Sequence, residues 1–154
     1  MVGEPEIIAA QLNTALRRRR GVRAIALHTY ARELALLLCP EVANGDRANA
    51  AEQLIRRACA AIGQPTGQVL EILCAFAPGS DWQTLSLRRE KAGALLGQYG
   101  VQADTLRRSY IWDELMLELG IAIRGVMNSE QAPPVEPPNQ EPAGDEGDED
   151  NPAA

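Results

Sequence analysis

Aromatic residues are scarce in this chain of 154 residues, at 4% of the sequence, with one Phe and two Trp. Apolar residues as a whole reach 45%, and they are mainly Leu, Ala and Ile. A β-sandwich core would draw on Val, Thr, Tyr and Phe, whereas small aliphatic side chains suit closely packed helices. The composition therefore favours one all-α domain of ordinary size.

Cysteine is also rare, and its spacing excludes a familiar class of metal site. Cys39, Cys59 and Cys74 lie more than four residues from one another, so the chain has no Cys-x-x-Cys pair. The odd number and the lack of an export signal in "MVGEPEIIAAQLN" argue against a secreted disulfide scaffold. We therefore expect three buried free thiols, no bound metal and a cytoplasmic protein.

Long apolar runs and catalytic motifs are missing too. No window reaches the roughly 18 apolar residues that a membrane span needs, so we expect no membrane partner. His28 is the one histidine, and we expect it to be structural. The chain contains no phosphate loop, nucleophile elbow or dinucleotide fingerprint. We expect that the protein is not an enzyme and that it binds no cofactor.

Basic residues are absent from the last part of the chain. Residues 129–154 contain eight acids and no Lys or Arg, which leaves 13 of the 21 acids against 15 bases in residues 1–128. The body thus has a charge of +2 and the tail −8. Prolines and acids predict a disordered tail over 129–154, beside a helical domain over 1–128. A weakly basic body is compatible with nucleic-acid binding.

Apolar positions at helical spacing predict a compact bundle of about six helices. Gly21 is expected to end the first helix and Asp46 to cap the third. The predicted helices cover residues 5–19, 22–38, 47–62, 67–77, 86–97 and 103–124.

The stretch "LSLRREKAGALLGQYGVQADTLRR", residues 85–108, carries the main functional signal. Ser86 is expected to cap its first helix and Gly97 to end it in a left-handed conformation. A helix-turn-helix places polar residues early in its second helix, where they meet bases and phosphates. Thr105, Arg107 and Arg108 occupy that position. The pattern predicts a helix-turn-helix shape for residues 85–124.

These residues resemble a module that recurs in small helical actinobacterial proteins and is described as helix-turn-helix-like. The resemblance covers about a quarter of the chain and implies a fold more than an activity. One departure is the six-residue segment "QYGVQA" in the turn, where the module has about three residues. The matching positions are Leu85, Arg88, Arg89, Ala92, Leu95, Leu96 and Gly97, followed by Thr105, Leu106, Arg107 and Arg108.

Two functions follow from these patterns. The first is a DNA-binding transcriptional regulator that uses Arg88, Arg89, Thr105, Arg107 and Arg108. Against it, Asp104 stands at the right spacing to pair with Arg107 and Arg108 within one helix.

The second function is a non-enzymatic adaptor that docks a protein partner, or a second copy of itself, through the Leu-rich last helix. A further basic patch, Arg17, Arg18, Arg19 and Arg20, would either bind phosphates or satisfy carbonyl groups at a helix end. The acidic tail could fold back on the basic body and compete with an acidic partner.

Overall fold

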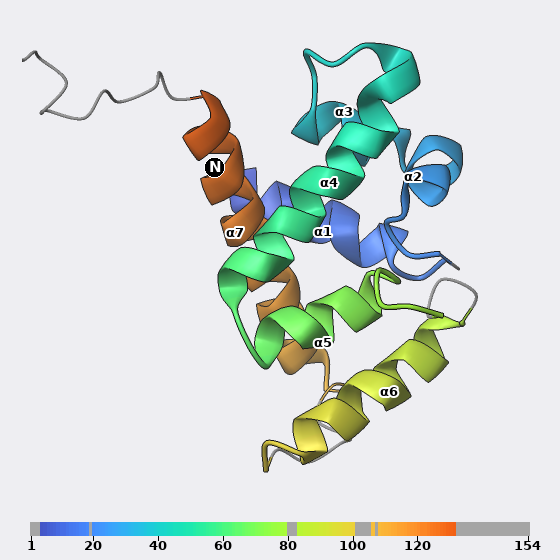
Figure 1. Cartoon of the computed structure of the whole chain (residues 1–154), viewed down its shortest axis with the longest axis vertical. Helices are drawn as coiled ribbons and strands as arrows, with labels where there is room; N and C mark the ends of the chain where they lie inside the picture. The colour runs from blue at the N-terminus through green and yellow to red at the C-terminus, as the bar shows by residue number, and fades with distance from the viewer. Residues whose placement is uncertain (1–3, 19, 80–82, 101–105, 107, 132–154) are drawn as a thin grey trace, which may run out of the picture.

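The computed structural model describes residues 4–18, 20–79, 83–100, 106 and 108–131, and all of its regular secondary structure is helical (Figure 1). This confirms the predicted all-α class. None of the described helices is long and apolar enough to cross a membrane. The helices are α1 (Glu4–Ala15), α2 (Ala24–Tyr30), α3 (Arg32–Leu38), α4 (Asn44–Ile62), α5 (Thr66–Leu73), α6 (Leu85–Gly97) and α7 (Ser109–Gln131).

The first and last helices pack side by side and run in opposite directions. Near one end, the indole N–H of Trp112 on α7 donates a 2.7 Å hydrogen bond to Oδ1 of Asn13 on α1. Near the other, Arg124 forms a 2.9 Å ion pair with Glu4. Between them Gly120 lies so close to α1 that an added Cβ would stand 2.5 Å from the carbonyl oxygen of Pro5. A residue without a side chain is what permits this approach.

Helices α2 and α3 correct the prediction of one helix over 22–38. The chain breaks at Ala31, whose φ of −137° and ψ of 46° are not helical. No glycine or proline signals this break, so the sequence pattern hides it. The change of direction lets both short helices bury residues against the rest of the bundle, among them Leu27 and Leu34. Tyr30, which would share an apolar stripe with Leu27 and Leu34 in a single long helix, is 59% exposed.

Glu52 on α4 joins α2 to the bundle. Its carboxylate accepts a 2.6 Å hydrogen bond from the backbone N–H of Ala24, the first residue of α2. The same carboxylate is held by Arg56 Nε at 2.9 Å. No side chain next to α2 in the sequence caps it, so a residue 28 positions away satisfies one of its free N–H groups.

Several predicted helix ends differ from the observed ones. α1 stops at Ala15, so the basic run follows the helix instead of ending it, and Arg20 and Gly21 have left-handed φ values of 67° and 51°. α4 already begins at Asn44 and places Asp46 inside its first turn, where it caps nothing. α5 ends at Leu73, short of the predicted residue 77.

Both ends of α6 also differ from the prediction. Thr84, not Ser86, caps it, because the Thr84 hydroxyl accepts the N–H of Leu87 at 3.2 Å. Gly97 stays helical, and the left-handed residue is Gly100, with a φ of 84°.

The start and the end of α7 differ from the prediction as well. Residues 101–105 and 107, where the start was expected, lie outside the described part, and α7 is helical from Ser109. At its other end α7 continues to Gln131, so the predicted tail boundary at Ser129 falls within a helix. The rest of the tail, 132–154, lies outside the described residues.

Candidate functional site

Arg88, the central arginine of the predicted DNA-binding set, is fully buried. Its guanidinium donates hydrogen bonds to the carbonyl oxygens of Leu16 at 2.6 Å, Gln83 at 2.8 Å and Leu73 at 3.0 Å. Burial lowers the pKa of Arg88, and the adjacent Cys74 opposes that shift. The planar fork of an arginine matches several carbonyl groups at once. Arg88 therefore holds the turn after α1 to the end of α5 and does not face a nucleic acid.

The other predicted contacts are divided between the core edge and the surface. The guanidinium of Arg89 stacks on the ring of Trp112, with 4.3 Å between its central carbon and the ring centroid. Arg108 is exposed, and its Nη1 lies 3.4 Å from the Tyr110 hydroxyl. Thr105 and Arg107 lie outside the described residues. Arg88 therefore does not share a basic face with Arg89 and Arg108, because Arg88 is internal.

The packing of α6 also bears on the predicted helix-turn-helix shape. Within the described residues α6 packs mainly on α5, while α7 packs on α1 and α4. The Arg89–Trp112 stack is a contact between α6 and α7. The apolar side of α7, with Met116, Leu119 and Ile123, is buried in the core. The main apolar face of the last helix is thus already covered by this chain.

The second predicted basic patch lies in the turn between α1 and α2. Arg17 and Arg18 are exposed, Arg20 is half-buried, and Arg19 lies outside the described residues. The Arg18 guanidinium carbon sits 4.4 Å from the centroid of the Tyr30 ring. In this turn Arg88 donates to the backbone carbonyls of Leu16 and Arg18. We had expected residues of the basic run itself either to satisfy carbonyl groups at the helix end or to bind phosphates.

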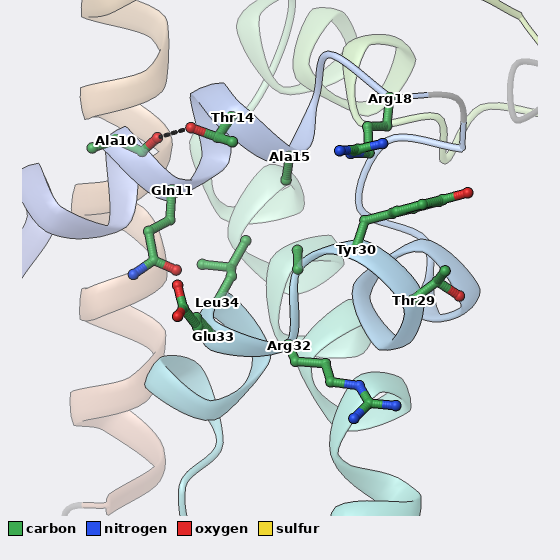
Figure 2. A pocket seen from close by; sticks show the side chains of 11 residues that line it. Ala10, Gln11, Thr14, Ala15, Arg18, Thr29, Tyr30, Arg32, Glu33 and Leu34 are labelled. Carbon is green, nitrogen blue, oxygen red and sulfur yellow. Dashed lines mark hydrogen bonds between the residues drawn. The ribbon is translucent and has the colours of Figure 1, made fainter.

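A hollow of about 540 Å³ lies next to this basic turn, between α1 and the α2–α3 corner (Figure 2). Arg18 and Tyr30 stand at one end, with the tyrosine ring extended beneath the guanidinium. Gln11 on α1 and Glu33 on α3 line its other end. Such a mixture of aromatic, apolar and hydrogen-bonding groups is typical of a binding hollow.

Two exposed apolar side chains lie on the helices that flank this hollow, each about one turn from a lining residue. Ile7 lies one helical turn before the lining residue Gln11 and is 39% exposed. Leu36 lies nearly one turn after Glu33 and is 48% exposed. We call the hollow together with Ile7 and Leu36 the α1–α3 groove. Exposed large apolar residues near a hollow favour its use as an interaction surface.

The fold brings together two thiols that the sequence keeps 15 positions apart. The pKa of Cys74 is raised well above that of an ordinary thiol, first by a hydrogen bond with the side chain of Cys59 and then by burial. Both thiols are buried as predicted, whereas Cys39 is half-buried. A raised pKa disfavours the thiolate, which is the nucleophilic form. Among the described residues no group of His, Cys, Asp and Glu could hold a metal ion.

Comparisons of the chain with models of known protein families, with curated proteins and with solved structures found no match.

Sequence reasoning missed the residues of the groove for a definite reason. Tyr30 fits the apolar stripe of one continuous helix, and only the break at Ala31 turns it outward. Gln11 and Thr14 read as ordinary polar positions of α1. One signal in the sequence pointed to this site. The basic run begins shortly after the end of α1, and Arg18 of that run lines the hollow together with residues of α1.

Proposed function

We propose that this protein is a helical protein-interaction module that binds a peptide segment of a partner in its α1–α3 groove. The carrying observation is the hollow of about 540 Å³ bounded by Arg18 and Tyr30. This proposal keeps the adaptor function expected from the sequence but moves the docking surface away from the last helix, whose main apolar side is buried.

The chemistry of the groove supports a peptide ligand. Tyr30 offers a broad ring face and a hydroxyl at an exposed position, which is how tyrosine contributes to binding surfaces. Arg18 is already stacked on that ring and faces solvent, so it can pair with a carboxylate while keeping its stacking contact. Gln11 supplies an amide for a peptide backbone.

Selection of random peptides displayed on phage against the immobilised full chain tests this function. We expect selected peptides to bind the wild-type chain and to lose at least about tenfold in affinity for Tyr30→Ala, the loss typical of a central aromatic contact. Tyr110→Ala is the matched control, since Tyr110 is 58% exposed and Tyr30 59%. Equal losses of affinity for the two variants, or peptides whose affinity changes with neither substitution, would contradict the proposed site.

DNA binding is a second candidate, favoured by the exposed Arg17 and Arg18 in one turn and Arg108 on the surface. It no longer relies on Arg88. A gel shift with genomic fragments at two salt concentrations tests it, because contacts to phosphates weaken steeply with salt. We expect Arg17→Ala with Arg18→Ala to reduce any binding, and a shift that does not depend on salt would exclude phosphate contacts by this turn.

A further inference from the structure

In the segment that follows α7, prolines and acids are concentrated in different parts of the sequence. Residues 132–154 contain six prolines, seven acids and no Lys or Arg. The prolines come first, in "APPVEPP" at 132–138, and the acids gather later, in "DEGDED" at 145–150. A proline-rich stretch favours the extended polyproline II conformation, which docks well on aromatic side chains.

The side chains along the α1–α3 groove follow a similar order, from apolar to basic. Its one end is lined by Gln11 and Glu33, about one helical turn from the exposed Ile7 and Leu36, and its other end carries Tyr30 and Arg18. Arg17 is exposed and precedes Arg18 in the sequence. An apolar stretch followed by acids would therefore meet apolar side chains first and cations last, provided that it enters at the end where Ile7 lies.

The C-terminal half of α7 passes the start of α1 at that end. Gly120 is against Pro5, Arg124 pairs with Glu4, and the helix continues past the start of α1 (Figure 1). Met127 lines a small hollow together with Leu38, the last residue of α3. Gln131, the last residue of α7, thus lies about 16 Å beyond the Gly120–Pro5 contact at the rise of an α-helix.

The reach of the tail is sufficient. The part of α7 beyond Gly120 and the stretch from Pro5 to Arg18 together measure about 36 Å at the rise of an α-helix. The acidic cluster begins 14 residues after Gln131. In polyproline II form those residues span about 43 Å, so the cluster reaches Arg18 without strain.

We propose that residues 132–154 occupy the α1–α3 groove of the same molecule, with the prolines along Ile7, Leu36 and Tyr30 and the acids at Arg17 and Arg18. This inference rests on the proposed interaction function and adds to it a built-in competitor. A partner segment that displaces the tail must then offer the same chemistry, an acidic and proline-containing peptide. Tethering gives the tail an effective concentration of the order of mM, so it competes well even with modest intrinsic affinity.

The test uses the full chain and a labelled synthetic peptide of residues 132–154, followed by fluorescence anisotropy. In one variant the seven acids of 132–154 are changed to Gln and Asn, which leaves the folded part untouched. We expect the peptide to bind this neutral-tail chain at least about tenfold more tightly than wild type, whose own tail holds the groove. Equal binding to the two chains would overturn the proposal.

Two pairs of matched variants in the neutral-tail chain locate the binding surface. Tyr30→Ala is compared with Tyr110→Ala, and Arg18→Ala with Lys91→Ala, an exposed cation on α6. We expect a loss of roughly tenfold for the groove member of each pair and less than about twofold for its control, with weaker binding at high salt. A loss as large for Tyr110 as for Tyr30 would move the tail to α7 and refute the groove.

Three further outcomes test the identity of the occupant and separate this inference from the function on which it rests. Sedimentation of the wild-type chain at rising concentration should show a monomer, and a dimer that requires Tyr30 would assign the tail to a second copy instead. Displayed peptides that need Tyr30, with no binding of the tail peptide, would leave the interaction groove standing and remove the tail as its occupant. Loss of both would reject the groove altogether.

Discussion

The guanidinium Nη2 of Arg88 donates a 2.6 Å hydrogen bond to the carbonyl oxygen of Leu16, a residue 72 positions earlier in the chain. This contact joins α6 to the turn after α1, and the same side chain reaches the carbonyl of Leu73 at the end of α5. Arg88, which the sequence predicted to contact DNA, thus donates hydrogen bonds to carbonyl groups near helix ends inside the protein, because a buried carbonyl group needs a donor.

Removing the guanidinium of Arg88 is expected to destabilise the fold strongly. Arg88→Met leaves several buried carbonyl oxygens without donors, and we expect a loss of about 3–5 kcal/mol in the free energy of unfolding, measured by urea titration. Arg88→Lys keeps the charge but not the fork, so its loss should be smaller. Lys91→Ala, on the exposed side of the same helix, should change stability by less than about 0.5 kcal/mol. Similar curves for Arg88→Met and Lys91→Ala would contradict the assigned role.

A pair of glycines on α7 tests the close contact with α1. At Gly120 an added Cβ would meet the Pro5 carbonyl oxygen at 2.5 Å, whereas at Gly125 it would meet nothing within 4 Å. We expect Gly120→Ala to cost about 2–3 kcal/mol because the two helices must separate. Gly125→Ala should stabilise the protein by up to about 1 kcal/mol through helix propensity alone. Thermal unfolding of the two variants checks the opposite signs, and equal shifts would exclude the tight crossing.

The carboxylate of Glu52 is expected to hold the start of α2 in place. In Glu52→Ala the N–H of Ala24 and the guanidinium of Arg56 lose their acceptor, so we expect about 1–3 kcal/mol of lost stability. Hydrogen exchange should accelerate at Ala24 and along α2 more than along α4. Glu114→Ala, at an exposed position of α7, serves as the control. Unchanged exchange at Ala24 would show that the capping bond contributes nothing.

The pair of buried thiols predicts a loss of stability at alkaline pH. The pKa of Cys74 is raised in the folded protein, so unfolding favours release of its proton. The stabilisation from the protonated thiol is complete below the unfolded pKa of about 8.5 and disappears as pH rises through the higher folded value. We expect the free energy of unfolding to fall above about pH 8.5. Cys74→Ala should fall less steeply over the same range, and parallel pH profiles would argue against this origin.

The positions of most helices were predictable because each has its own apolar periodicity. The ranges 5–19, 47–62 and 86–97 each overlap an observed helix over most of its length. The prediction failed where a local pattern had two solutions. The apolar positions from Ile25 to Leu38 fit one long helix as well as two short ones. Packing against the rest of the bundle selects two short helices, and this arrangement leaves Tyr30 exposed.

Candidate site residues were harder to predict, because an arginine side chain has the same chemistry inside and outside. The paired Arg88 and Arg89 read as one basic patch, yet Arg88 points into the core and Arg89 stacks on Trp112. A difference of one position is a rotation of about 100° around an α-helix, so neighbours in sequence face different surroundings. Which of them meets solvent depends on where α5 and α1 lie.

The sequence by itself determined the helical class, the approximate helix positions, the lack of a Cys-x-x-Cys pair and the separation of a weakly basic body from an acidic tail, since propensity, periodicity and charge are properties of local segments. The tertiary structure alone decided that Arg88 is internal, that Glu52 caps α2 and that Arg18 meets Tyr30 beside a hollow. These contacts join residues that are far apart in the chain. They exist only when whole helices have packed, because packing settles which polar groups lose water and must find partners.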